Sequence, residues 1–133
     1  MERYSVKYIL PVILWMAVIF VSSSLPQDVF PKVNSWIWAK LVHLVYFGVL
    51  ALLVQRALLS QEKYRLLLKY VQLISILFAV FYGASDEIHQ LFTPGRHAQI
   101  TDVLIDGFGA SLFILGSIAY RTLVPKLART DSK

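Results

Sequence analysis

Residues 83–109 read GASDEIHQLFTPGRHAQITDVLIDGFG, and the rest of the chain is arranged around them. Four carboxylates, two histidines and an arginine fall within this stretch, although the segments on either side are strongly apolar. Its central Thr-Pro-Gly-Arg, residues 93–96, predicts a tight turn between two helices, because Pro and Gly supply turn geometry. Ionisable groups in or near a membrane are costly and are retained mainly where they face protein or water. The stretch therefore predicts a helical hairpin whose polar end is the place to look for function.

The composition indicates an integral membrane protein with one small domain. Of the 133 residues, 57% are hydrophobic and only 16% are charged, whereas a typical soluble domain has about 25% charged residues. The chain has no cysteine, which excludes disulfides and thiol chemistry. The net charge of +5 is explained by basic residues that flank the apolar segments, so we expect no nucleic-acid partner.

Four segments are apolar enough to cross a bilayer, whose core of about 30 Å needs about 20 residues of helix. We predict an all-α, antiparallel bundle of four transmembrane helices over residues 8–24, 38–59, 70–92 and 100–120, in a single domain of residues 1–133. The first segment lacks a clean cleavage site, and we interpret it as a retained span rather than a signal peptide. Pro11 is expected near its start, where a helix tolerates proline. Residues 26–35 and 60–65 are expected to be loops.

The basic residues predict the orientation, because cytoplasmic loops carry the excess of Lys and Arg. Ten of the thirteen basic residues fall on one side if there are four spans: Arg3, Lys7, Arg56, Lys63, Arg65, Lys69, Arg121, Lys126, Arg129 and Lys133. The opposite side has Lys32, Lys40 and Arg96. Both termini are therefore predicted to be cytoplasmic, with residues 121–133 as a short basic tail.

Polar groups from every predicted helix meet at the extracytoplasmic end of the bundle. They are Ser22, Ser23, Ser24, Lys40, His43, Asp86, Glu87, Gln90, Arg96, Asp102 and Asp106. Residues three and four apart share a helix face. Three such stripes are predicted: Lys40, His43 and Phe47; Gly83, Glu87 and Gln90; and Asp102, Asp106, Gly109, Phe113 and Gly116. The glycines of the third stripe allow close helix contact, so we expect its two aspartates to point into the bundle.

The simplest interpretation of these polar residues is a structural network of ion pairs. Lys40 and Arg96 can neutralise two of the carboxylates, and complete pairing is the default for buried polar groups, because a half-satisfied network is expensive. Two cations cannot neutralise four carboxylates, however. At least one carboxyl group must therefore be protonated, solvated or paired with a ligand.

Acid–base chemistry and metal binding are two further interpretations. Crowded, partly desolvated carboxyl groups hold protons more tightly, which suits a general acid near neutral pH. The candidate catalytic residues are Glu87, Asp106 and His43, with His43 as a proton shuttle. Asp and Glu residues with His43 or His89 could also hold a divalent ion. The spacing matches no recognised ligand pattern, so we expect no metal and no cofactor, and Asp86 and His89 are better explained as a surface pair.

The same residues carry a family resemblance. Residues 85–90 (SDEIHQ), residues 92–96 (FTPGR), and Asp102 and Asp106 before Gly109 resemble the signature of VanZ-like membrane proteins. On the second predicted helix, Lys40, His43 and Tyr46 are similar to the upstream motif of that family. The likeness covers about residues 11–116. Two positions differ from the family pattern, since Ala39 stands where members often have aspartate and Asp106 stands where many have asparagine.

The resemblance implies a multi-pass protein of the bacterial cytoplasmic membrane, embedded in the lipid bilayer and with a role at the cell envelope. The named member of the family is associated with low-level resistance to the glycopeptide teicoplanin. We therefore expect a polar pocket that recognises an anionic envelope molecule, such as a lipid-linked cell-wall precursor or the antibiotic itself. The expected ligand-binding residues are Lys40, Asp86, Gln90, Arg96 and Asp102, with Arg96 and Lys40 holding the anion.

Two other classes of function stay open. One is an extracytoplasmic membrane enzyme that acts on a lipid head group, with Glu87 or Asp106 as acid or base. The other is a small membrane partner that stabilises another envelope protein, in which the polar residues are only structural.

Overall fold

The computed structural model describes residues 2–29, 35–61, 64 and 68–130. This part of the chain is helical and contains no strand. Its elements are the α-helices α1 (Glu2–Ser23), α2 (Ser35–Leu59), α4 (Val71–Gln90) and α5 (Ile100–Thr130), and one short 3-10 helix, η1 (Gln27–Val29). The predicted loops 26–35 and 60–65 lie partly outside the described residues.

All four α-helices are long and apolar enough to cross a membrane. The candidate spans are Val6–Ser23, Trp36–Leu59, Val71–Gln90 and Ile100–Leu123. Even the shortest, with 18 residues, covers about 27 Å at a rise of 1.5 Å per residue. Large apolar side chains such as Phe81 and Leu104 are exposed on the outer faces, as expected for surfaces that contact lipid. The prediction of an all-α protein with four membrane-spanning helices is confirmed.

Two helix boundaries differ from the predicted ones. α1 begins at Glu2, so Pro11 lies inside the helix and not near its start. Proline lacks the backbone N–H that would bond to the residue four positions earlier, so α1 continues through Pro11 with one intrahelical hydrogen bond missing. α5 continues to Thr130, so most of the predicted basic tail is helical.

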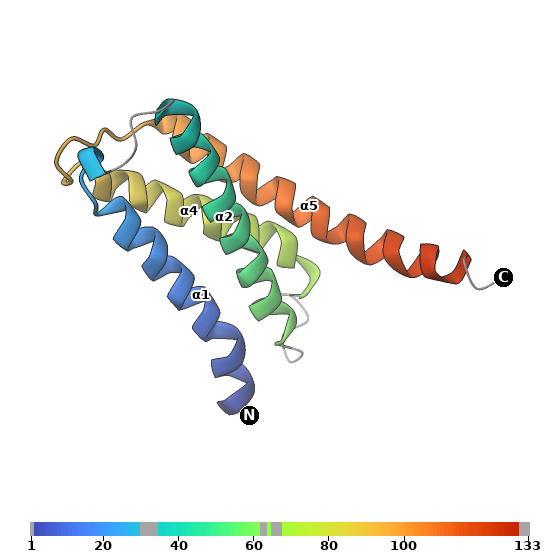
Figure 1. The fold of residues 1–133 in the computed structure, drawn as a ribbon. Helices are drawn as coiled ribbons and strands as arrows, with labels where there is room; N and C mark the ends of the chain where they lie inside the picture. The colour runs from blue at the N-terminus through green and yellow to red at the C-terminus, as the bar shows by residue number, and fades with distance from the viewer. Residues whose placement is uncertain (1, 30–34, 62–63, 65–67, 131–133) are drawn as a thin grey trace.

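The helices converge at one end of the bundle and spread apart toward the other (Figure 1). The convergent end contains the end of α1, the beginning of α2, the end of α4 and the beginning of α5, and we call it the polar end. Residues 91–99 connect α4 to α5 there, and Gly95 has a φ of 73° in this turn, which glycine adopts readily. α2 makes its most extensive contact with α5 and also packs against α4 and α1.

A small apolar core holds the bundle together. Its buried members are Val12, Ile19, Phe47, Leu50, Ala51, Val54, Ala79, Ala110 and Ile114. The close approach of α5 to α2 requires Gly109, where a Cβ atom would lie 2.3 Å from the carbonyl oxygen of Leu44. Gly116 is exposed, and a Cβ atom there would meet nothing within 4 Å. Gly109 therefore lies on the packed face of α5 as predicted, whereas Gly116 does not. In the next turn of α5, the buried residue is Ile114.

Single cysteine substitutions test the predicted orientation of the bundle in the membrane. Because the chain has no cysteine, each substitution gives one clean reporter. Asp28→Cys and His97→Cys, at exposed positions near the polar end, are expected to react with a membrane-impermeant maleimide on intact cells. Gln61→Cys, after α2, is expected to react only when the membrane is permeabilised. The opposite labelling pattern would place the polar end in the cytoplasm and contradict the predicted orientation.

Candidate functional site

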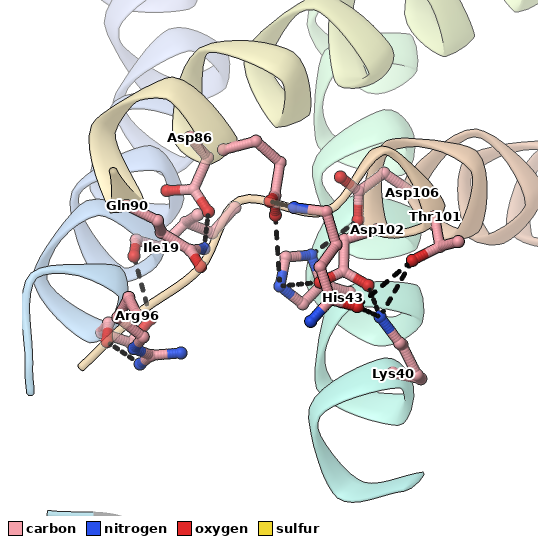
Figure 2. A network of polar contacts seen from close by, with 12 residues as sticks. Ile19, Lys40, His43, Asp86, Gln90, Arg96, Thr101, Asp102 and Asp106 are labelled. Atoms are coloured by element: carbon pink, nitrogen blue, oxygen red, sulfur yellow. Dashed lines mark hydrogen bonds and ion pairs between the residues drawn. The ribbon is translucent and has the colours of Figure 1, made fainter. Parts of the chain in front are cut away.

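The polar end contains a cluster of ionisable side chains from α2, α4, α5 and the connection 91–99 (Figure 2). We call it the polar cluster, and it includes all eight residues proposed from the sequence: Lys40, His43, Asp86, Glu87, Gln90, Arg96, Asp102 and Asp106. Six of them are buried, namely Lys40, Asp86, Glu87, Gln90, Asp102 and Asp106. Charged side chains are rarely fully buried unless they are paired. Their partners therefore decide what the cluster can do.

Lys40 forms an ion pair with Asp102 between α2 and the first turn of α5. Its ammonium group also donates hydrogen bonds to Oε1 of Gln99 at 3.0 Å and to Oγ1 of Thr101 at 3.2 Å. The negative charge of Asp102 in the first helical turn is favourable for the α5 dipole. Lys40 therefore joins α2 to the beginning of α5 in this structure.

His43 and Asp106 form a second contact between α2 and α5. Nδ1 of His43 lies 3.0 Å from Oδ1 of Asp106, a distance at which a protonated Nδ1 donates to the carboxylate. Asp106 is completely buried, and Gly83 of α4 makes room for it. A Cβ atom at Gly83 would lie 2.3 Å from Oδ2 of Asp106. Asp106 thus points into the bundle as predicted, and Gly83 on the facing helix leaves the space for its carboxylate.

Glu87 of α4 is bonded through only one of its two carboxylate oxygens. Oε2 accepts a hydrogen bond of 2.7 Å from the backbone N–H of Gln99, whereas Oε1 lies 3.9 Å from Nε2 of His43. Among the described residues, Oε1 of Glu87 and Oδ2 of Asp106 are the buried side-chain atoms without a hydrogen-bond partner. His43, Glu87 and Asp102 each offer one atom that could bind a metal ion, and these atoms lie within 4.8 Å of one another. A buried acceptor without a donor costs free energy, so Glu87 has capacity for a further partner.

Asp86 and His89 do not form the surface pair suggested by their spacing. Asp86 is buried, and its Oδ2 accepts a hydrogen bond of 2.9 Å from Nε2 of Gln90. His89 instead faces α1, where its ring stacks on Phe20 and its Nε2 lies 2.9 Å from Oγ of Ser24. The prediction was wrong because Asp86 is buried and bonds to Gln90 on its own helix, whereas the ring of His89 contacts the end of α1.

Arg96 connects the 91–99 segment to the end of α1. Its Nε and Nη2 groups donate hydrogen bonds of 3.2 Å to the carbonyl oxygens of Leu25 and Ser22. Burial lowers the pKa of the Arg96 guanidinium, and the nearby charges of Asp86 and Glu87 oppose that shift. Arg96 therefore stays close to two carboxylates of the cluster while it binds one carbonyl group in the last turn of α1, Ser22, and one just after the helix, Leu25; basic side chains commonly bind carbonyl groups at a helix C-terminus.

Sequence reasoning missed Gln99 and Thr101, which complete the cluster. Gln99 binds Glu87 through its backbone N–H and Lys40 through its side chain. Both residues lie where α5 begins, just before or within its first turn. The first N–H groups of a helix have no partner in the helix itself. The predicted beginning of this helix could therefore have pointed to Gln99 and Thr101, because polar residues next to unpaired N–H groups are well placed to bind neighbouring side chains.

Comparison with known proteins identifies a family. Residues 8–123 match the family model described as VanZ/LLP1. No curated protein and no solved structure matches the chain. The matched residues include almost all of the four candidate spans and the entire polar cluster.

Proposed function

Since the chain belongs to the VanZ/LLP1 family, we propose that it is a protein of the bacterial cytoplasmic membrane whose polar cluster binds an anionic molecule of the cell envelope. The match confirms the VanZ-like resemblance identified from residues 85–109. The proposed ligand is a lipid-linked cell-wall precursor, and a glycopeptide such as teicoplanin is the second candidate. By binding either ligand, the protein would contribute to glycopeptide resistance.

The observation that supports binding most directly is the free acceptor on Glu87. Its Oε1 atom is buried and has no hydrogen-bond donor among the described residues. The head group of a lipid-linked precursor carries sugar hydroxyl groups, which are donors, and phosphates, which are acceptors. The hydroxyl groups suit Glu87, and the phosphates suit the guanidinium of Arg96 at the partly exposed edge of the cluster. Lys40 is committed to Asp102, so Arg96 is the main anion-binding residue in this proposal.

A specific contact also favours a second function, an acid–base enzyme acting on a lipid head group. Nδ1 of His43 is held by Asp106, and Nε2 of the same ring faces Oε1 of Glu87. An imidazole placed between two carboxylates can pass a proton from one side to the other, and the carboxylate on Nδ1 fixes its tautomer. In this scheme Glu87 is the acid or base next to the substrate, and His43 is the shuttle.

A titration with lipid II, the undecaprenyl-linked cell-wall precursor, tests the proposed function. We expect it to raise the melting temperature of the purified protein in detergent saturably. Arg96→Gln is expected to weaken this binding about 10-fold or more, because a hydrogen bond to a charged group contributes about 1.5–3 kcal/mol. Arg121→Gln, at an exposed position on the opposite end of α5, is the matched control and should bind like the wild type.

The outcomes separate the alternatives. Teicoplanin in place of lipid II identifies the antibiotic as the ligand. If Glu87→Gln still binds lipid II but no longer converts it to a product that the wild type releases, the protein is an enzyme. A fall in the melting temperature of ligand-free Arg96→Gln, with no saturable binding of either ligand to the wild type, contradicts the binding function and leaves the structural role.

A further inference from the structure

Three potential metal ligands face a common point in the polar cluster, and each comes from a different helix. Nε2 of His43 on α2 lies 3.9 Å from Oε1 of Glu87 on α4 and 4.0 Å from Oδ2 of Asp102 on α5. The set of three lies within 4.8 Å. Zinc binds nitrogen and oxygen at about 2.0–2.2 Å in a tetrahedral arrangement, so two ligands of one ion are separated by about 3.3–3.6 Å. The three atoms lie somewhat farther apart than this, so the side chains would move closer together around a bound ion.

The imidazole of His43 is already oriented for this role. Its Nδ1 contacts the buried carboxylate of Asp106, which leaves Nε2 facing Glu87 and Asp102. A metal-binding histidine almost always donates its other ring N–H to a carboxylate, a carbonyl oxygen or water, which fixes the tautomer and increases the basicity of the ligand. Asp106 therefore takes the place of such an outer partner.

The two carboxylates are oriented in the same way. One oxygen of Glu87 is fixed by the backbone N–H of Gln99, and one oxygen of Asp102 is fixed by Lys40. In each case the second oxygen is the one that faces His43. The second oxygen of Glu87 is buried and has no donor within the described chain. An unpartnered acceptor aimed at two other potential ligands indicates that a cation belongs between them.

The charge of the cluster supports the same conclusion. Lys40 and Arg96 balance two of the four carboxylates, so two negative charges are left when all four are ionised and His43 is neutral. Such an excess is unfavourable in a buried site unless it is paired. One divalent cation would supply the missing charge. It would also favour the binding of an anion, because it removes the remaining negative charge of the cluster.

We infer that His43, Glu87 and Asp102 form a binding site for one divalent transition-metal ion, with zinc as the best-fitting ion. An imidazole with two carboxylates favours zinc over calcium or magnesium, which prefer sites made of oxygen ligands alone. Three protein ligands leave a coordination position for water or a ligand oxygen, as in catalytic zinc sites. This inference goes beyond the proposed function. With the ion bound, Oε1 of Glu87 is a metal ligand, and the open coordination position would receive an oxygen of the envelope molecule in its place.

Zinc binding by the full chain in detergent tests the inference. After treatment with EDTA and its removal, we expect isothermal titration with zinc chloride to give one saturable site per chain and a higher melting temperature. Calcium or magnesium in excess should not displace the zinc. Glu87→Gln is expected to weaken zinc binding at least about 10-fold, because even partners outside the ligand shell typically contribute 10–100-fold to metal affinity. His97→Gln, which removes an exposed histidine of the 91–99 segment, is the control for adventitious binding and should bind zinc normally.

The melting temperature of metal-free Glu87→Gln shows whether a loss of zinc binding comes from a folding defect. The amide can still accept the hydrogen bond from Gln99, and it removes a buried charge without a partner. We therefore expect metal-free Glu87→Gln to melt no lower than the metal-free wild type, while its response to zinc is lost. Absence of a saturable zinc site in the wild type overturns the inference, and so does zinc binding that is lost in His97→Gln but kept in Glu87→Gln. A wild type that binds zinc but not lipid II contradicts the proposed function and leaves the metal site standing.

Discussion

Gly109→Ala is expected to lower the melting temperature of the bundle strongly, although it adds a single methyl group. The new Cβ atom would lie 2.3 Å from the carbonyl oxygen of Leu44 and 2.9 Å from its Cα atom. These are backbone atoms, which cannot rotate away as the end of a flexible side chain can. α2 and α5, the two helices with the most extensive contact, would have to move apart. Overpacking typically costs about 1–3 kcal/mol and occasionally more, and we expect a value at the upper end or above it.

Two glycines on the same helix provide matched controls. A Cβ atom at Gly116 meets nothing within 4 Å, and alanine favours helix over glycine by about 0.8–1 kcal/mol. Gly116→Ala is therefore expected to melt at the wild-type temperature or above it. At Gly107 the nearest atom is a methyl carbon of Val80 at 3.2 Å, which predicts a small effect. Thermal unfolding of the purified proteins in detergent measures all three, and equal melting of Gly109→Ala and Gly116→Ala would show that α2 and α5 do not approach so closely.

Lys40→Met is expected to be the most destabilising single substitution in the polar cluster. The side chains of Lys40 and Asp102 are only 11% and 8% exposed, so removing the ammonium group leaves a carboxylate buried without its cation. Breaking a buried pair in this way typically costs about 3–5 kcal/mol. Gln99 and Thr101 lose a hydrogen-bond donor in the same variant. Unfolding in the presence of EDTA gives the effect without any contribution from bound metal.

A double-mutant cycle tests whether this effect comes from the ion pair itself. Asp102→Asn removes the charge that Lys40→Met leaves behind, so the double variant is expected to be more stable than Lys40→Met alone. Residues in direct contact typically show coupling energies of about 0.5–3 kcal/mol. Strictly additive losses would mean that Lys40 stabilises the bundle mainly through its other contacts.

The sequence was sufficient to predict the fold, because the fold depends on a property summed over many residues. About 20 apolar residues in each of four segments set the number of spans, and no single residue changes that result. The ends of the helices were harder to predict. Polar residues before Pro11 and after Tyr120 can continue a helix beyond the bilayer as readily as they can end it, and α1 and α5 do continue.

The sequence also predicted which polar residues lie together at one end of the bundle, but it did not predict the contacts between them. Helical spacing was enough to put Asp102 and Asp106 on a buried face. Which cation meets which carboxylate depends on distances between helices, and these follow from packing rather than from spacing along the chain. Arg96 illustrates the difference, since its hydrogen bonds to the carbonyl oxygens of Leu25 and Ser22 could not be predicted from its position in the sequence. His43, Glu87 and Asp102 could not be recognised as a set from a ligand motif, because each lies on a different helix.

The bonds from Arg96 to the end of α1 have a consequence for how the protein is made. Arg96 is 71 residues away from Leu25 and 74 residues away from Ser22 along the chain. The ribosome therefore delivers α1 to the membrane well before its final partners have been translated. During that interval the carbonyl groups of Ser22 and Leu25 lack the guanidinium group that binds them in the finished protein, and they depend on other donors such as water or lipid head groups. The contact between the end of α1 and the 91–99 segment is therefore one of the later contacts to form as the chain is synthesised.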